Sequence, residues 1–350
     1  MTTLRHLGAA SALALLAGPA LAQDADPELV VLDYPGFETP EFHASYVEKN
    51  GMSPTFSFFG DEEEAFQKVR AGFQADVSHI CAGSVTKWQE SGLIEPWDTS
   101  RLEYFADLNG DLLGTQTVAE GELFFLPTDF GTTAIAFNPD EVPAEDVASL
   151  DVFLNPAYAG RIAIPDNVDD AWALAYLATG VTDWTSVTDE QFEAAANWLR
   201  EVHPNLRTYW TDPAELAQLM STGEVLVAWA WNETYPTMQE EGRPIGFQRE
   251  PAEGSSVWLC GFVNMANAPG SEDKAYDYAN AFLAPSTTIP LAEAGWASAN
   301  DTALREQITE EDLTASGLGT IQAPIFAQVP ISIESRERHA QTFEEIKAGF

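Results

Sequence analysis

The residues of this chain that could do chemistry are aromatic side chains with acidic residues close by. Tyr34 directly follows Asp33, and Glu233 comes two residues after Trp231. The face of an aromatic ring attracts a cation, and a carboxylate forms charge-assisted hydrogen bonds with an ammonium group. These pairs therefore indicate a binding site for a small organic cation.

Patterns that carry catalysis or bind a metal are missing from the sequence. It contains no GxSxG, HExxH, GxxxxGK[ST] or GxGxxG motif. The five histidines are scattered without ligand spacing. Two cysteines without a nearby histidine cluster do not make a zinc site. We therefore expect neither an enzyme nor a bound cofactor or metal.

Several of the aromatic residues lie where predicted strands end. Residues 28–34 (ELVVLDY) and 225–231 (VLVAWAW) are typical of β-strands, so Tyr34 and Trp231 stand at strand ends. In open α/β sheets, ligands bind outside the carboxyl ends of the strands. Trp172 is an exception, because it falls in an apolar helical stretch and is expected in the core.

Short apolar runs alternate with amphipathic stretches along the chain, which is typical of an α/β fold with mostly parallel strands. Residues 189–202 form the clearest predicted helix, with one apolar face. Residues 123–127 and 134–138 are predicted as two strands around a turn at 128–131. No long Pro/Gly/Ser linker separates two continuous domains. This favours two lobes that the chain passes through more than once.

The composition is strongly acidic. Of 350 residues, 55 are acidic and 16 are basic, which gives a formal net charge of −39. Such a surface repels nucleic acids and anionic membranes, so we exclude both as partners. Acids spread along the whole chain are typical of adaptation to a salty medium, and they also attract cationic solutes. Both explanations of the charge stay open.

The first residues have the layout of a secretory signal. Arg5 and His6 precede the apolar run AASALALLAGPALA, which ends in the small-x-small site at residues 20–22. We expect cleavage after Ala22 and a soluble mature protein in the periplasm. The alternative, a membrane anchor, is disfavoured because the run is shorter than the roughly 20 residues that a span needs.

Five segments carry a family resemblance. They are FLPTDFGTTAIAFNPDEV (125–142), AYAGRIAIPDNVDDAW (157–172), AELAQLMSTGEVLVAWAWN (214–232), EGSSVWLCGFVNMANAPGSEDKAYDYANAFLAP (253–285) and the ending FEEIKAGF. In this order and spacing they resemble the periplasmic polyamine-binding proteins, the spermidine/putrescine receptors of ABC importers. Each motif alone is weak, but together they cover nearly the whole mature chain.

The resemblance implies a type II periplasmic binding protein. This fold has two α/β lobes, each a mostly parallel sheet flanked by helices, with a ligand cleft between them. Lobe 1 would hold residues 23–131 and 262–304, and lobe 2 residues 132–261 and 305–350. The ligand would be a small cationic amine and the protein partners the permease subunits of an ABC importer. We expect a monomer.

The resemblance also implies site residues. It places an opening aromatic pair on Tyr34 and Phe37 and a further cleft aromatic on Phe130. Two cleft tryptophans fall on Trp231 and Trp258. The remaining implied ligand-binding residues are polar, namely Asn167, Asp170 and Gln328. Of these, Asp170 corresponds to a carboxylate that holds an ammonium group.

The sequence departs from the family pattern at several acidic positions. Gly36 replaces the acid between the opening aromatics, Asn167 stands where a second acid is usual, and Cys260 replaces a central aspartate. The tyrosine expected near Gly83 is absent too. An ammonium group buried without a carboxylate would cost several kcal/mol.

Two explanations of the missing acids follow. Other acids, for instance Asp33 or Asp129, could supply the charge. Alternatively, the ligand has fewer ammonium groups than a polyamine, as a monoamine, a quaternary amine or a zwitterion does. The retained aromatics and the reduced number of acids favour such a ligand over a linear polyamine.

The two cysteines, Cys81 and Cys260, give conflicting signals. An exported protein with an even count favours a disulfide. The resemblance places Cys81 in the cleft wall of the first lobe and Cys260 near the strand that crosses between the lobes. A bond there would tie the lobes together, so we expect two reduced thiols, with Cys260 as a small uncharged wall of the cleft.

Three other functions stay open. A binding protein for a sugar or an oxyanion would need arginine, serine or helix N-terminal donors in its cleft. An exported enzyme is disfavoured by the missing motifs. A receptor subunit could use the fold only to contact another protein, and it would then bind no small molecule.

Overall fold

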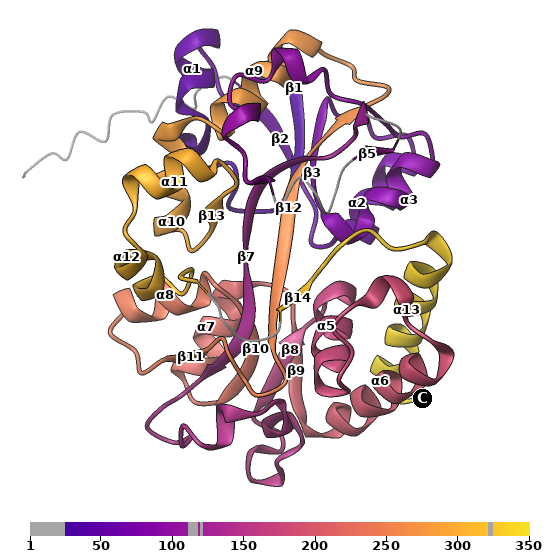
Figure 1. Ribbon diagram of the computed structural model, residues 1–350, viewed down its shortest axis with the longest axis vertical. Helices are drawn as coiled ribbons and strands as arrows, with labels where there is room; N and C mark the ends of the chain where they lie inside the picture. The colour runs from indigo at the N-terminus through magenta and orange to yellow at the C-terminus, as the bar shows by residue number, and fades with distance from the viewer. Residues whose placement is uncertain (1–24, 111–117, 120–121, 321–324) are drawn as a thin grey trace, which may run out of the picture.

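A computed structural model describes residues 25–110, 118–119, 122–320 and 325–350 (Figure 1). The predicted signal peptide and its cleavage after Ala22 lie outside these residues. In the part of the chain that the structure describes, no helix is long and apolar enough to cross a membrane.

One mixed β-sheet forms the centre of the molecule, with the strand order β2-β1-β3-β12-β7-β10-β8-β9. These strands are β1 (Asp26–Asp33), β2 (Pro54–Phe58), β3 (Val77–Cys81), β7 (Leu126–Phe137), β8 (Ile162–Pro165), β9 (Leu206–Trp210), β10 (Val227–Trp231) and β12 (Ser255–Met265). The shorter strands are β4 (Ile94–Glu95), β5 (Val118–Ala119), β6 (Glu122–Leu123), β11 (Gly246–Gln248), β13 (Ala297–Ser298) and β14 (Ile325–Ala327). Figure 1 shows β7 and β12 running between the upper and the lower strands.

The two ends of the sheet are parallel, and its centre is antiparallel. β1 pairs in parallel with β2 and β3, and β8 does so with β9 and β10. β12 is antiparallel to both β3 and β7, and β7 is antiparallel to β10. The predicted α/β architecture is confirmed. The strands of this path belong to one continuous mixed sheet, however, and not to two separate, mostly parallel ones.

The prediction of a turn at residues 128–131 is wrong. β7 runs unbroken from Leu126 to Phe137, and residues 129–133 pair with β12. The polar and glycine residues that suggested a turn are instead held extended by ladder hydrogen bonds. The register shifts once, so that Cys260 lies opposite Asp129 and Gly261 opposite Pro127. Thr128 is therefore the extra residue of a β-bulge.

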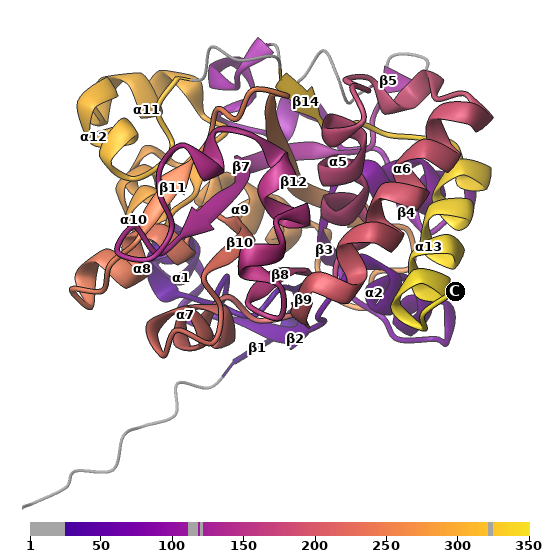
Figure 2. The same cartoon turned by 90° about the horizontal axis from the view of Figure 1, so that it is seen from below.

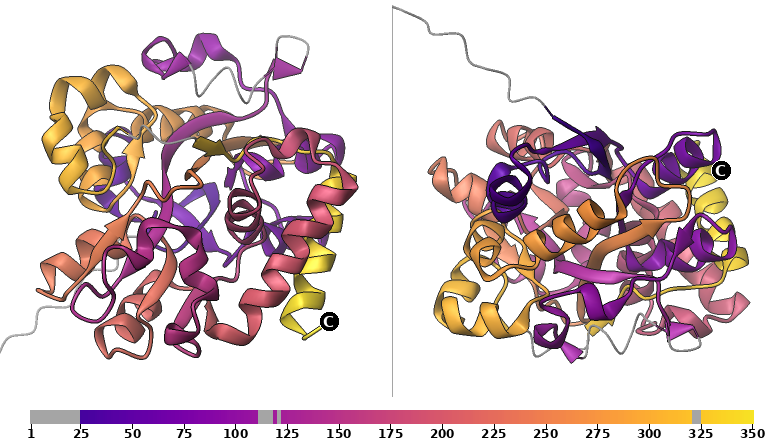
Figure 3. Two further views of the ribbon diagram at one scale, coloured as in Figure 1. Left: turned by 60° about the horizontal axis from the view of Figure 1, so that its bottom comes forward. Right: turned by 90° about the horizontal axis from the view of Figure 1, so that it is seen from above.

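Helices lie on both sides of the strands, as Figure 2 shows from below. They are α1 (Ala44–Asn50), α2 (Glu62–Arg70), α3 (Val85–Glu90), α5 (Val168–Ala178), α6 (Asp189–Val202), α7 (Pro213–Ser221), α8 (Thr234–Glu240), α9 (Glu272–Phe282), α10 (Thr288–Glu293), α11 (Asp301–Gln307), α12 (Glu310–Ala315) and α13 (Ile333–Lys347). The C-terminal helix α13 packs beside α5 and α6 (Figure 3).

The helix predicted at 189–202 is confirmed as α6, with the same bounds. Thr188 and Gln191 form a capping box at its start, which satisfies backbone donors that the first turn leaves free. Its apolar face is buried through Phe192, Ala196 and Leu199. Trp172 of α5 is fully buried, as predicted for a core residue.

The hydrophobic core is divided between the two ends of the sheet. Two clusters of buried side chains surround β1, β3 and the upper part of β12. Two others surround β8 and β10 and include residues of α5, α6 and α7. Burial of apolar surface therefore stabilises each end of the sheet separately, and the middle of β7 and β12 lies between them.

Candidate functional site

A pocket with a volume of about 180 Å³ lies where the two ends of the sheet meet. Its walls contain nearly all the predicted ligand-binding residues: Tyr34, Phe37, Asp129, Asn167, Asp170, Trp231, Trp258, Cys260 and Gln328. They also contain Pro35, Gly60, Glu62, His79, Cys81, Asp169, Thr211, Asp212, Pro213, Glu233 and Trp296. Phe130 is the one implied residue that does not line the pocket.

The β-bulge decides which face of the sheet these side chains share. Side chains alternate between the faces of a strand, so Trp258 and Cys260 of β12 lie on one face. Without the bulge, Leu126 and Asp129 of β7 would point to opposite faces, because they are three residues apart. Since Thr128 is inserted, Asp129 lies opposite Cys260 and shares the pocket face. Phe130 therefore points to the other face and packs against a core cluster.

Three charged side chains meet at the carboxyl ends of β1 and β3. His79 contacts Asp33 through Nδ1 at 2.8 Å and Asp129 through Nε2 at 3.0 Å. All three side chains are fully buried. Burial alone would lower the pKa of His79, but the two carboxylates outweigh it and raise that pKa to about 10. His79 is therefore a buried imidazolium held between two acids.

Asp170 is held at the start of α5. The helix begins after Asn167, whose side chain accepts a hydrogen bond from the Asp170 backbone N–H at 3.0 Å. The Asp170 carboxylate accepts hydrogen bonds from Thr133 at 2.6 Å, Gln328 at 3.1 Å and Trp231 at 2.6 Å. Burial nevertheless raises its pKa to about 6. Three donors fix this carboxylate beside the pocket.

Aromatic rings form much of the pocket wall. Phe37 stacks on Trp296 with ring centroids 4.2 Å apart. It also forms a T-shaped contact with the His79 ring, with centroids 4.5 Å apart. Trp258 packs close to the backbone of β7, because a Cβ at Gly131 would lie 2.5 Å from its ring. Glycine at 131 thus makes room for Trp258.

Glu233 is an acid of the pocket that the resemblance did not imply. It follows Trp231 by two residues, at the start of α8. Its carboxylate accepts one hydrogen bond from Trp296 at 3.3 Å. Burial raises its pKa to about 7, and the nearby Asp170 and Asp129 raise it further. Glu233 therefore adds a carboxylate that can gain or lose a proton near neutral pH.

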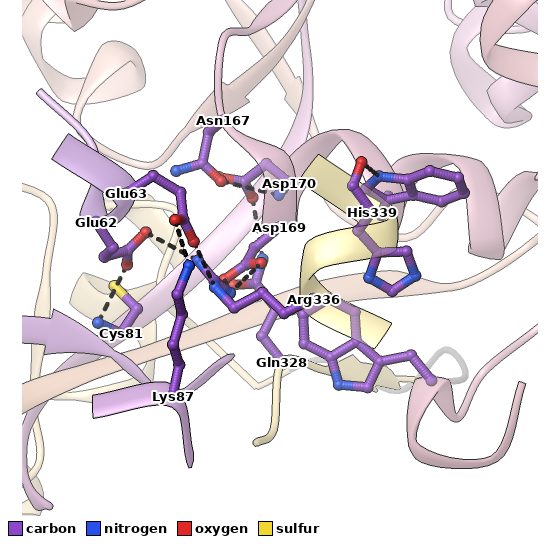
Figure 4. Close-up of polar contacts among 12 residues, drawn as sticks. Glu62, Glu63, Cys81, Lys87, Asn167, Asp169, Asp170, Gln328, Arg336 and His339 are labelled. Carbon is purple, nitrogen blue, oxygen red and sulfur yellow. Dashed lines mark hydrogen bonds and ion pairs between the residues drawn. The ribbon is translucent and has the colours of Figure 1, made fainter. Parts of the chain in front are cut away.

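Two acids of the pocket, Glu62 and Asp169, belong to a network of ion pairs whose contacts Figure 4 shows. Arg336 of α13 contacts Asp169 of α5 at 2.8 Å and Glu63 of α2 at 3.0 Å. Glu62 lies 3.8 Å from Arg336, and Lys87 pairs with Glu63 at 2.6 Å. Burial and Asp169 raise the pKa of Glu62 to about 7, although Arg336 opposes this.

The network depends on a glycine in the loop after β3. A Cβ at Gly83 would lie 2.5 Å from the Asp169 carboxylate and 3.2 Å from Arg336. Side chains of α5 and α13 approach Gly83 so closely that a larger residue would collide with them. This explains why a small residue stands near the position where the family pattern has a tyrosine.

Cys81 and Cys260 form a disulfide, so the prediction of two reduced thiols is wrong. The two residues face each other in the antiparallel ladder between β3 and β12, with Cα atoms 3.9 Å apart. They lie well inside the distance of about 7 Å beyond which cysteines cannot be bridged. The resemblance supplied a position for each cysteine but no strand register, and the register decides this pairing.

Several pocket residues were not predicted as site residues, among them Glu62, His79, Asp169 and Trp296, and Glu233 was noted only as an acid close to Trp231. His79 carried a usable signal, because it is a titratable residue inside an apolar strand, where an unpaired charge is costly. No cluster of three or more His, Cys, Asp or Glu that could hold a metal occurs among the described residues.

The profile of bacterial extracellular solute-binding proteins matches residues 41–315 of this chain. The chain belongs to this family. It is therefore a protein that binds a solute outside the cytoplasm, as expected, and not an enzyme.

Individual relatives support this assignment. The spermidine/putrescine-binding periplasmic protein of Escherichia coli K12 is 26% identical over 83% of this chain and 82% of its own length. A putative spermidine/putrescine ABC transporter from Listeria monocytogenes has a similar structure, with a TM-score of 0.79 at 19% identity over 91% and 98% of the two chains. The PBP MotA from A. tumefaciens B6, solved in complex with glucopine, has a TM-score of 0.73 at 18% identity over 91% and 99%.

Proposed function

We propose that this family member captures a small cationic or zwitterionic amine and delivers it to the permease subunits of an ABC importer. One observation carries the proposal: among the described residues that line the pocket, acids occur without a lysine or an arginine. The one basic residue among the described lining residues is His79, and two aspartates already pair with it. A pocket of this kind attracts a cation and repels an oxyanion.

The aromatic walls support the same ligand class. Trp231, Trp258 and Trp296 all line the pocket together with Asp129 and Asp170. A desolvated cation over an aromatic ring gains about 2 kcal/mol. A neutral sugar would leave the buried carboxylates without a counter-charge, which is costly. The site therefore favours an amine over a sugar.

We further propose that the protein has two lobes that close on the ligand. Lobe 1 would comprise residues 23–131 and 262–304, and lobe 2 residues 132–261 and 305–350. Two features support this division. The core clusters lie at the two ends of the sheet, and the pocket draws Tyr34 and His79 from one end and Asp170 and Trp231 from the other.

The relatives suggest the ligand class without fixing the ligand. The E. coli relative is described as binding spermidine and putrescine, and a protein of the same fold was solved with glucopine. A change of ligand within one fold is common.

We propose a periplasmic monomer, exported by a signal that is cleaved after Ala22. N-terminal sequencing of the exported protein tests this, and a mature chain that starts elsewhere contradicts it.

A thermal-shift screen tests the function. The panel contains putrescine, spermidine, ethanolamine, choline and 4-aminobutanoate, with glucose, sulfate and phosphate as the other solute classes. A ligand that binds the folded state raises the melting temperature by mass action. We expect stabilisation by at least one amine and none by the sugar or the anions. Stabilisation by sulfate, phosphate or glucose alone would contradict the proposal.

A further inference from the structure

Each of the two aspartates that contact His79 has a buried carboxylate oxygen without a hydrogen-bond partner among the described residues. Asp129 Oδ1 accepts hydrogen bonds from His79 at 3.0 Å and from Thr128 Oγ1 at 2.7 Å. Asp129 Oδ2 is buried and accepts no hydrogen bond from the described residues. Buried polar atoms are nearly always hydrogen-bonded, so such an oxygen needs an explanation.

The position of Asp129 supplies the explanation. Asp33 also has an oxygen without a partner among the described residues, but Asp33 does not line the pocket. Asp129 does line it, because the bulge at Thr128 places it on the pocket face. Its Oδ1 is fixed by His79, which orients the carboxylate. A donor for Oδ2 can therefore come from a molecule in the pocket.

The five other acids of the pocket already have partners. Asp212 accepts a hydrogen bond from the Ala214 N–H, and Glu62 accepts one from the Cys81 N–H. Asp169 forms an ion pair with Arg336 at 2.8 Å. Asp170 accepts three hydrogen bonds, and Glu233 accepts one from Trp296. Among the acids that line the pocket in the described part of the chain, Asp129 is the one with a buried carboxylate oxygen that no described residue satisfies.

The charge balance points to a single positive group at this place. Asp33 and Asp129 are two acids that share one basic partner, His79. One ammonium group of a ligand would give the second acid a basic partner of its own. Its N–H groups also supply the donor that Asp129 Oδ2 needs. A quaternary ammonium group has the same charge but no N–H to donate.

We propose that Asp129 Oδ2 accepts a hydrogen bond from the ligand's ammonium group, that His79 positions this carboxylate, and that the ligand is consequently a protonated amine with an N–H group and not a quaternary amine. The inference rests on the proposed function, because it names the class of amine within it. His79 acts as a positioning residue, and Asp129 makes the contact.

Matched pairs of ligands test the contact in the wild-type protein. Titration calorimetry compares ethanolamine with choline, and 4-aminobutanoate with its N-trimethyl derivative. A lost charge-assisted hydrogen bond weakens binding about tenfold or more. We expect this loss for the trimethylated member of any pair that binds. Equal or tighter binding of the trimethylated member would overturn the inference while leaving the proposed function intact. Absence of binding by every amine of the screen would instead overturn the proposed function.

Two matched variants assign the effect to Asp129. Asp129→Asn and Asp33→Asn each remove one carboxylate next to His79, but only the first changes a pocket residue. We expect Asp129→Asn to abolish the discrimination between the amine and its trimethylated analogue, and Asp33→Asn to retain it. Retained discrimination in a folded Asp129→Asn protein would overturn the assignment. If that variant does not fold, the wild-type comparison still decides the class of amine.

Discussion

At the scale of single residues, Asp170 illustrates the cost of burying an acid beside the pocket. Its carboxylate is buried, and burial raises its pKa from 3.8 to about 6 despite three hydrogen-bond donors. The folded protein therefore holds a proton at this group more tightly than the unfolded chain does. The contribution of Asp170 to stability is full below about pH 4 and is lost as the pH rises through about 6.

We predict that Asp170→Asn changes the pH dependence of stability. The variant cannot ionise at this position. Its unfolding free energy therefore does not fall, as that of the wild type does, when the Asp170 carboxyl ionises between pH 4 and about pH 8. A pKa rise from 3.8 to about 6 corresponds to about 3 kcal/mol. Urea denaturation at both pH values measures the difference in unfolding free energy, which should shift in favour of the variant by up to that amount.

The exposed Glu145→Gln variant serves as the control for this experiment. It should follow the wild type at both pH values, because an exposed acid has water around it in both states. A stability difference between Asp170→Asn and the wild type that is independent of pH would contradict a buried, proton-binding Asp170.

Much of the pocket was predictable from residue types and position. Tyr34, Trp231 and Trp258 were found because aromatic residues at strand ends and the family motifs agreed, and all three line the pocket. His79 was missed, since its role depends on Asp33 and Asp129 from other strands. Asp129 was predicted as an acid of the site, but the bulge that places it on the pocket face was not, because bulges leave almost no trace in a sequence.

At the scale of secondary-structure elements, the C-terminal helix α13 connects the two ends of the molecule. Arg336 of this helix reaches Glu63 of α2 and Asp169 of α5, and its side chain is 2% exposed. Under the proposed division, α2 belongs to lobe 1, whereas α5 and α13 belong to lobe 2. Under that division, Arg336 forms ion pairs with a helix of each lobe.

We predict that Arg336→Gln destabilises the protein by about 3–5 kcal/mol, because it leaves buried carboxylates without their counter-charge. Adding Asp169→Asn should recover part of this loss, and a double-mutant cycle by urea denaturation measures the coupling. Arg338→Gln on the same helix is the matched control, since its ion pairs with Asp189 and Glu193 are exposed.

An exposed pair contributes about 0–1 kcal/mol, so the control should change stability little. If Arg336→Gln is no more destabilising than Arg338→Gln, the buried network does not hold α13 to α2 and α5 as described.

The elements show why a sequence predicts helices and strands better than it predicts pairing. The bounds of α6 were recovered because its apolar face and cap are local features. The turn expected at residues 128–131 was wrong because β12 pairs with this segment from more than 120 residues away along the chain. The disulfide was missed for the same reason, since it depends on the register of β3 and β12.

At the scale of the whole molecule, the dominant feature is the net charge of −39. Repulsion among like charges destabilises a compact state, and salt screens it. The ion pairs described above use only a small part of the acids, so most of the charge lies on the surface.

We predict that raising NaCl from about 0.05 M to about 1 M increases the melting temperature, because the screening length falls from above 10 Å to about 3 Å. The same change should weaken amine binding, since it also screens the attraction of a cation to the acidic protein. Differential scanning calorimetry and titration calorimetry measure the two effects. A melting temperature that falls with salt would contradict the role given to surface repulsion.

The general arrangement of the chain was easier to predict from the sequence than the contacts of single residues or the pairing of strands. The order of the five family segments predicted the α/β architecture, and the absence of a linker predicted that the chain passes between its two ends more than once. The continuous mixed sheet was not predicted, because β7 and β12 each belong to both ends, and a division into lobes assigns a strand to one or the other.

The central claim is that the pocket between the two ends of the sheet binds a protonated amine. A crystal structure with the amine that stabilises the protein most in the screen tests it most directly. We predict that its ammonium nitrogen lies within hydrogen-bond distance of Asp129 Oδ2, with the rest of the ligand against Trp231 and Trp258. An amine bound outside this pocket, or an ammonium group in the pocket that contacts none of its carboxylates, would contradict the account.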